Sequence, residues 1–219
     1  MSSSITIVSG LPRTGTSLMM KMLEAGGVPV YIDNVRVADV DNPGGYYELE
    51  DVKKIKEDTS WMDAAGGKAF KMVSMLLFDL PGDRRYRIVF MERNLDEVIA
   101  SQRKMLERMG KTPTDTDDHD AKRLFTKHLR EVKDWLSAQE NMDVLYMPYE
   151  DVMGEPQASA SRVSGFMGGL DTVKMASVVR PELYRNKAEG PAVVEETVDE
   201  LDDEEEEAVK ERLADLGYM

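Results

Sequence analysis

The sequence predicts an α/β protein, a three-layer α/β/α arrangement around a mostly parallel central sheet. Short β-branched apolar runs alternate along the chain with longer amphipathic helical patterns, which is the order of βαβ units. The runs are short and apolar, which is typical of buried strands. The length of 219 residues suits one ordinary domain with a sizeable core.

Five short runs are the strand candidates. The first covers residues 5–8 and ends at Ser9-Gly10. The others are residues 28–32, 69–73, 87–91 and 144–147. The run at 87–91, Arg-Ile-Val-Phe-Met, is the clearest of them, because its apolar centre leads directly into a helix start.

Helices are expected between and after these strands. One starts at Ser17 and stops at Gly26-Gly27, and another, capped by Asn94 with Glu97 at its third position, runs to residue 109. A long helix carries an apolar stripe made of Leu124, Phe125, Leu129, Val132 and Leu136. Further helical segments are predicted at 46–56, 75–80, 149–166 and 195–207, with an Asp-rich loop at 111–120.

The composition excludes several classes of protein. With 42% hydrophobic and 32% charged residues the chain is globular rather than disordered. No apolar run approaches the roughly 18–20 residues of a membrane span, and no secretory leader is visible. Cysteine is absent, so a disulfide framework or a thiol nucleophile is excluded. We expect a soluble, cytoplasmic protein.

The formal net charge of −14 is unevenly distributed. Residues 195–219 hold 12 acidic and 2 basic residues, which leaves 30 acidic and 26 basic residues in 1–194. We therefore predict one α/β domain over 1–194, followed by an acidic helix or tail over 195–219. This acidity disfavours nucleic acid and anionic membranes as partners, because phosphate binding depends on Lys and Arg.

The segment Gly10-Leu-Pro-Arg-Thr-Gly-Thr-Ser17 lies between the first strand and the first helix. Backbone N–H groups and the helix dipole favour an anion at such a place. The spacing is that of a Walker A loop, which is typical of the P-loop NTPase fold, but Thr16 replaces the lysine and Arg13 lies inside the loop. The alternative is a tight turn with a solvated Arg13.

The missing lysine bears on the chemistry. P-loop kinases hold a polyphosphate with that lysine and with Mg²⁺ bound by a Walker B aspartate. Here the strand at 87–91 ends in Glu92-Arg93, so a cation stands beside the only acidic candidate. A sulfuryl group carries less charge than a γ-phosphate and needs no metal. A kinase with a degenerate loop and an inactive nucleotide-binding protein remain the alternatives.

Three blocks of the sequence resemble the sulfotransferases that use 3′-phosphoadenosine-5′-phosphosulfate (PAPS). Residues 11–17 resemble their 5′-phosphosulfate loop. Arg93-Asn-Leu-Asp-Glu-Val-Ile-Ala-Ser101 resembles their 3′-phosphate motif, and Tyr149-Glu-Asp151, with Pro156 and Phe166-Met-Gly168 after it, resembles their Tyr-Glu-Asp segment. The blocks occur in family order, and the resemblance spans residues 5–187.

The resemblance implies a set of donor-binding residues and the product 3′-phosphoadenosine-5′-phosphate (PAP). The residues implied to hold the 5′-phosphosulfate are Pro12, Arg13, Thr14, Gly15, Thr16 and Ser17. Arg93 and Ser101 would hold the 3′-phosphate, Tyr149 would lie near the adenine, and Arg185 would close over the 3′-phosphate. The alternative for Arg93 is an ion pair with Asp96 or Glu97.

The catalytic base is the open question. Many cytosolic family members carry a histidine where this chain has Phe70-Lys71-Met72-Val73-Ser74. Lys71 is then an active-site cation beside Arg13, and Glu48 is the leading base, with Glu50 and Asp33 as runners-up. The alternative for Lys71 is a solvated side chain on a short strand. The alternative for Glu48 is a carboxylate at a helix start, near the positive end of the helix dipole.

The remaining polar and aromatic residues give weaker signals. His119 among aspartates favours a solvated helix start over a metal site, and no metal is expected. His128 lies near the apolar stripe of the long helix and is expected to be semi-buried, with its hydrogen bonds satisfied. Tyr46, Tyr47 and Trp61 could line a pocket for a small-molecule acceptor that carries a hydroxyl or an amine. Monomer and homodimer remain open.

Overall fold

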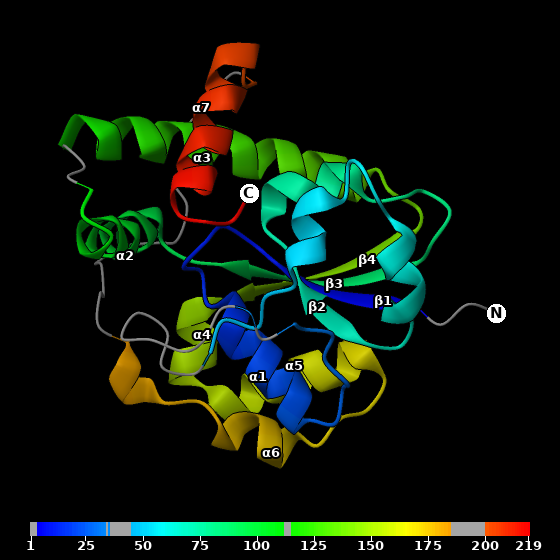
Figure 1. The fold of residues 1–219 in the computed structure, drawn as a ribbon. Helices are drawn as coiled ribbons and strands as arrows, with labels where there is room; N and C mark the ends of the chain where they lie inside the picture. Colours follow the sequence, from blue (N-terminus) through cyan, green and yellow to red (C-terminus); the bar gives the residue numbers. More distant parts are fainter. Residues whose placement is uncertain (1–3, 34, 36–44, 112–114, 185–199) are drawn as a thin grey trace.

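Four parallel strands form a single sheet in this computed structural model, which describes residues 4–33, 35, 45–111, 115–184 and 200–219. The strands follow the order β2-β1-β3-β4 across the sheet (Figure 1). Their bounds are β1 Ile5–Ser9, β2 Ala69–Lys71, β3 Tyr86–Glu92 and β4 Met142–Pro148. The predicted strands at 5–8, 69–73, 87–91 and 144–147 are confirmed.

Helices cover both faces of the sheet. Those on one face are α1 Thr16–Ala25, α4 Tyr149–Gly154, α5 Pro156–Met167 and α6 Thr172–Ser177 (Figure 1). The other face carries α3 Asp115–Ser137, the helix α2 Leu95–Arg108 that contacts it, and α7 Asp203–Asp215. Short 3₁₀ helices complete the fold: η1 Glu50–Lys54, η2 Ser60–Ala65, η3 Ser74–Asp79 and η4 Pro181–Leu183. The predicted α/β/α layers are confirmed.

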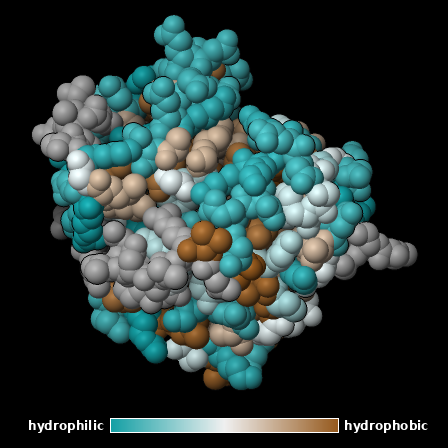
Figure 2. Space-filling model, in the orientation of Figure 1, coloured by the Kyte–Doolittle hydropathy of each residue, from teal (hydrophilic) through white to brown (hydrophobic). Residues whose placement is uncertain are grey.

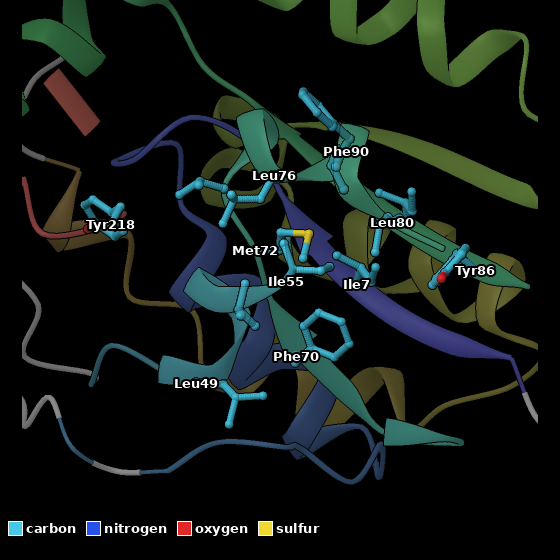
Figure 3. Close-up of a cluster of buried hydrophobic side chains, with 14 of the residues drawn as sticks. Ile7, Leu49, Ile55, Phe70, Met72, Leu76, Leu80, Tyr86, Phe90 and Tyr218 are labelled. Carbon is cyan, nitrogen blue, oxygen red and sulfur yellow. The ribbon is translucent and has the colours of Figure 1, made fainter. Parts of the chain in front are cut away.

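Neighbouring residues of each central strand face opposite layers. Ile7 and Phe90 belong to the core under the 3₁₀ helices and α3, and Figure 3 shows them with Phe70, Leu76 and Leu80. The next residues along the same strands, such as Val8 and Met91, belong to the core under α1 and α4–α6. Burial on both faces explains why these strands are apolar throughout.

Two predicted elements are shorter in the structure. Residues 28–32 form no strand; Val30 makes one isolated bridge to Ala69. Pro29 has no N–H to donate, which limits pairing along this edge of the sheet. The helix predicted at 46–56 is the 3₁₀ helix η1 alone.

Two helix boundaries also differ from the prediction. α3 begins at Asp115, inside the expected loop at 111–120, because aspartates in a first turn favour the positive end of the helix dipole. The single helix predicted at 149–166 divides before Pro156, which occupies the first turn of α5, where its missing N–H costs nothing.

The acidic terminal segment forms a helix only in its second part. α7 begins at Asp203, after a capping box between Asp202 and Glu205, whereas 195–199 fall outside the described residues. Figure 2 shows hydrophilic residues over most of α7 at the top of the molecule. Among the described helices, none has the length and apolarity that crossing a membrane requires.

The strand order sets where a ligand can bind. From β1 the chain passes to β2 on one side, and then returns to β3 on the other side of β1. In open α/β sheets the crevice outside the carboxyl ends of the strands, at such a reversal, is the usual binding site. Two sequence motifs meet at this reversal: the loop that starts at Gly10 follows β1, and Arg93 follows β3.

Candidate functional site

The loop after β1 turns tightly over the end of β3. A side chain at Gly10 would place its Cβ 2.6 Å from the Met91 carbonyl oxygen. The buried Thr14 hydroxyl donates to the Leu11 carbonyl at 2.7 Å, and Arg13 adopts a left-handed φ of 78°. These contacts hold the loop in one defined conformation.

Helix α1 presents its N-terminal end to the same crevice. The helix begins at Thr16, and Gly15 at the N-cap supplies no side-chain cap. The first N–H groups of an α-helix have no acceptor inside the helix, and with the helix dipole they favour an anion. The half-buried hydroxyl side chains of Thr16 and Ser17 lie in this first turn. The arrangement suits a phosphate or sulfate group.

Gly15 is required by its surroundings. Its φ is +97°, and a Cβ at this position would lie 2.4 Å from Cδ2 of the Tyr149 ring. Tyr149 is the buried first residue of α4 and directly follows β4. The Tyr-Glu-Asp block is therefore in contact with the loop, although more than 130 positions separate them in the sequence.

Arg13, Arg93 and Ser101 form one connected group. The Arg13 Nε donates to the Ser101 hydroxyl at 3.0 Å, and Arg93 Nη1 donates to the Arg13 carbonyl at 3.0 Å. The Arg93 guanidinium also lies 4.3 Å from the centre of the Tyr149 ring, a cation–π contact. All three predicted blocks thus meet around two guanidinium groups at the carboxyl ends of β1, β3 and β4.

The alternative pairing of Arg93 is present as well. Its Nε donates to Glu97 Oε2 at 2.8 Å, and the Glu97 side chain is almost fully buried. Asp96 instead accepts from Lys122 at 2.7 Å. A guanidinium has five donors in a fork, so the ion pair with Glu97 and the bond to Arg13 coexist. Glu97 therefore holds the orientation of Arg93.

Tyr184 was not anticipated from the sequence. Its hydroxyl donates to Glu97 Oε1 at 3.0 Å, and its ring meets the Tyr149 ring edge-on at 5.2 Å. Burial, followed by the Glu97 carboxylate, raises the pKa of Tyr184 to about 12, so the hydroxyl stays a donor at neutral pH. Its position directly before Arg185, within the basic segment 180–187, was the only sequence signal. The neighbouring Arg185 lies outside the described residues.

Glu48 and Lys71 form a buried ion pair beside α1. Lys71 Nζ lies 3.1 Å from Glu48 Oε1 and donates to the Tyr46 carbonyl at 2.6 Å. The same carbonyl accepts from the Ser17 hydroxyl at 3.0 Å. The predicted base and the predicted cation are therefore linked to the first turn of α1, on the β2 side of the loop.

The runners-up for the base have structural contacts. The Asp33 carboxylate accepts the backbone N–H groups of Val35 and Glu50, and Glu50 pairs with Lys53 at 2.9 Å. Tyr47 donates to Glu24, and Trp61 packs edge-on against Phe70 in the core. His119 is exposed, and no cluster of metal-binding side chains occurs among the described residues.

A cleft lies behind the loop, between η3, α3 and α7. Its volume is about 300 Å³, and it is lined by Lys56, Met75, Leu76, Phe78, Asp79, His128, Glu131, Leu201, Glu206, Lys210 and Met219. His128 is fully buried, with Nε2 2.8 Å from the Ser74 hydroxyl, and Ser74 donates its N–H to the Gly10 carbonyl. Burial lowers the pKa of His128 to about 4, so the ring is neutral at neutral pH. The cleft gave no sequence signal.

Fold and site together define an α/β protein with a tight loop and a helix N-terminus, suited to an anion, at the reversal of its sheet. A family model for the sulfotransferase domain matches residues 4–208. The chain belongs to this sulfotransferase family. The loop, the Arg93–Ser101 block and the Tyr149 block all lie within the matched residues.

One solved structure supports the fold, and two others are similar over nearly the whole chain at lower TM-scores. The sulfotransferase STF1 from Mycobacterium tuberculosis H37Rv is similar over 81% of this chain and 72% of its own, with 12% identity and a TM-score of 0.52. The sulfotransferase domain from the curacin biosynthetic pathway shares 14% identity over 99% of this chain and 98% of its own, with a TM-score of 0.47. A sulfotransferase from Alicyclobacillus acidocaldarius shares 14% identity over 99% and 95%, with a TM-score of 0.46. No curated protein sequence matches this chain significantly.

Proposed function

We propose that this enzyme transfers a sulfuryl group from PAPS to a hydroxyl or amine of a small-molecule acceptor. The family makes it a sulfotransferase. The observation that carries the donor assignment is the convergence of Arg13, Arg93 and Ser101 on one crevice. Two guanidinium groups and a hydroxyl beside a helix N-terminus suit a nucleotide with phosphates at both the 3′ and 5′ positions.

In this proposal the donor site has two parts. The residues for the 5′-phosphosulfate are Pro12, Arg13, Thr14, Gly15, Thr16 and Ser17, through the loop and the first turn of α1. Arg93 and Ser101 hold the 3′-phosphate, and Tyr149 lines the adenine side next to Arg93. During transfer the acceptor oxygen or nitrogen bonds to sulfur, the bond from sulfur to the phosphate oxygen breaks, and the acceptor's proton leaves to a base.

We assign that base to Glu48 and the supporting cation to Lys71. Their ion pair is buried, and Tyr46 links it to Ser17 of the donor loop. A positioned carboxylate accelerates proton transfer by roughly 10²–10⁴-fold. A cation beside the transferred group stabilises the charge that develops on the leaving phosphate. Arg13 contributes the same support from the opposite side of the loop.

The cleft of about 300 Å³ supports a small acceptor with an apolar part. Met75, Leu76 and Phe78 give it an apolar wall. Met219, which lines the cleft, follows Tyr218 in the sequence, and the Tyr218 ring centre lies 5.5 Å from Lys71 Nζ. Replacing the partly exposed Phe78 by Glu should therefore raise KM for the acceptor and leave PAP affinity unchanged. The cytoplasmic location, the lack of a metal requirement and the choice between monomer and homodimer stay predictions.

The direct test is calorimetry with PAP and with 5′-AMP. The wild type should bind PAP much more tightly, because only PAP carries the 3′-phosphate. Arg93→Met should weaken PAP binding about 100-fold, since a charge-assisted bond to phosphate is lost, and should weaken 5′-AMP binding by no more than about tenfold, through the lost bond to the Arg13 carbonyl. Arg87→Met, on the same strand at its amino end, is the matched control and should bind PAP normally.

Two results would overturn this proposal. One is wild-type PAP binding no tighter than 5′-AMP binding. The other is magnesium-dependent ATP binding that exceeds PAP binding, which would favour the kinase alternative.

A further inference from the structure

The buried side chain of Gln102 connects the donor loop to the C-terminal helix. Gln102 follows Ser101 on α2 and is 0% exposed. Its Nε2 donates to the Pro12 carbonyl at 3.2 Å, and its Oε1 accepts from Arg212 Nε of α7 at 3.1 Å. Pro12 directly precedes Arg13, whose backbone has a left-handed φ of 78°. The carbonyl that Gln102 holds therefore lies at the strained point of the loop.

The chemistry of the three partners determines the orientation of the Gln102 amide. A carbonyl oxygen can only accept and a guanidinium can only donate. Arg212 therefore requires the amide oxygen on its side, which turns the NH₂ group toward the Pro12 carbonyl. Without Arg212 the buried amide oxygen would lose this partner, and the opposite orientation of the amide would put oxygen against oxygen.

Arg212 is itself held in place. Its guanidinium lies 5.8 Å from the centre of the Phe125 ring of α3 and 3.6 Å from Asp118 Oδ1. Glu205, at the start of the same helix, pairs with Lys127 at 2.7 Å and with Arg123. These contacts fix α7 across α3, as Figure 1 shows.

α7 and the donor loop also share an apolar cluster. Val209 and Leu213 of α7 are buried in one cluster with Leu11 of the loop. Leu11 is 0% exposed and also supplies the carbonyl to which Thr14 is bonded. The helix thus supports the loop at two successive residues, at Leu11 by packing and at Pro12 through Gln102.

We propose that Gln102 and Arg212 are positioning residues for the 5′-phosphate part of the donor site, and that α7 is a structural component of that site. This inference rests on the proposed function, since the loop must bind the donor. The net charge of α7 is strongly negative, yet it contributes to the site through Arg212 and through the buried side chains of Val209 and Leu213.

The test measures binding of PAP, 5′-AMP and 3′-AMP by calorimetry to the wild type, to four variants at Gln102 and Arg212, and to one control variant, all of the full chain. Gln102→Met and Arg212→Met should each weaken PAP and 5′-AMP about tenfold, because a buried hydrogen bond that shapes the loop is lost. Binding of 3′-AMP, which has no 5′-phosphate, should change less than twofold. A general loss of folding would weaken all three ligands alike.

Two conservative variants separate anchoring of the helix from support of the loop. Gln102→Glu keeps the pairing with Arg212 but cannot donate to the Pro12 carbonyl. It should therefore bind PAP about as weakly as Gln102→Met. Arg212→Lys keeps a donor for the amide oxygen and should bind PAP within about threefold of the wild type. Arg162→Met, which removes a half-exposed arginine of α5 paired with Asp151, is the matched control and should bind normally.

The outcomes distinguish this inference from the proposed function. If the wild type binds PAP no better than 5′-AMP, the proposed function fails first. If the wild type prefers PAP but Gln102→Met and Arg212→Met bind like the wild type, only the positioning role is wrong. Equal losses for 5′-AMP and 3′-AMP would likewise overturn it.

Discussion

The two sides of the site are built differently. On the side of β3 and β4, Arg93, Ser101 and Tyr149 stand on or next to regular elements, immediately after strand ends or inside a helix. On the side of β2, Glu48 lies in irregular backbone between Gly45 and η1, and Tyr47 beside it has a positive φ of 54°. The residues proposed to bind the nucleotide are therefore positioned by helices and strand ends, whereas the proposed base, Glu48, is carried by a loop.

This difference has a physical meaning for the two tasks. Recognition of two phosphates at a fixed spacing needs guanidinium groups held by rigid elements, and buried contacts such as Arg93 with Glu97 provide that. The acceptor side must suit one particular molecule, and loops carried on a rigid scaffold are where such variation is tolerated. Substitutions on the two sides should therefore have different signatures.

The largest effect is expected on the acceptor side. Glu48→Gln should lower kcat about 1,000-fold and leave PAP affinity within about threefold, because the group that takes the proton is lost. Turnover with a range of small hydroxyl acceptors and calorimetry with PAP are the measurements. Glu50→Gln, which removes a carboxylate that pairs with Lys53 across one turn, is the control.

A purely structural role for Glu48 predicts a different pattern. If the carboxylate only neutralised Lys71, adding Lys71→Met to Glu48→Gln would restore turnover to the level of Lys71→Met alone. Such a rescue, or wild-type kcat in Glu48→Gln itself, would remove Glu48 from the mechanism.

A smaller effect is expected where the nucleotide side meets the loop. Gly15→Ala should cost about 3 kcal/mol in the free energy of unfolding, because it combines a left-handed backbone with a contact 2.4 Å from the Tyr149 ring. Gly27→Ala has a similar φ of +102° but nothing within 4 Å, so it should cost only about 1 kcal/mol. Urea denaturation measures both.

The difference between these two variants isolates the contact with Tyr149. In a chain that already carries Tyr149→Ala, Gly15→Ala should therefore lower the free energy of unfolding no more than Gly27→Ala does. Equal losses in Gly15→Ala and Gly27→Ala would mean that the Tyr-Glu-Asp block does not constrain the loop.

The smallest effect concerns pH. The pKa of His128 is lowered to about 4 by burial, from 6.5. Between these values the unfolded chain binds a proton that the folded chain does not, so stability falls as pH falls through this window. We expect His128 to account for a loss of about 2 kcal/mol in the free energy of unfolding between pH 7 and pH 5. His128→Gln should lose that part of the slope.

The chain provides its own control for this pH effect, because it has only one other histidine. His119 has an exposed side chain, and His119→Gln should keep the wild-type slope. A His128→Gln variant with an unchanged slope would show that the ring is accessible to protons in the folded state.

That the residues of the proposed nucleotide side lie together could largely be predicted from sequence, because their signals are local. One signal is a glycine-rich turn after an apolar run, and the other is an arginine that follows a second such run. Both are short patterns that can be recognised without knowing the fold. The parallel order of the strands then brings the ends of β1 and β3 together, which explains why Arg13 and Arg93 meet. The sequence left open whether Arg93 pairs with Glu97, and the structure shows that both contacts exist.

The remainder could not be predicted because it depends on contacts between distant segments. Tyr184 reaches Glu97 across 87 positions, and the cleft gathers side chains from η3, α3 and α7. Val28–Ile32 read as a strand by composition, yet only Val30 pairs with the sheet, since pattern alone does not show how long a neighbouring strand is. His128 looked semi-buried because the packing of α7 and η3 around it has no signature within α3.

The link through Gln102 has a consequence for the order in which the molecule is completed. Gln102 joins residues 90 and 110 positions away in the sequence, in opposite directions along the chain. A ribosome releases the donor loop long before α7, so a nascent chain carries all three sequence motifs before the contact of Arg212 with Gln102 can form. A fragment that ends before α7 would contain all three sequence motifs and still lack the contacts of α7 that support the donor loop.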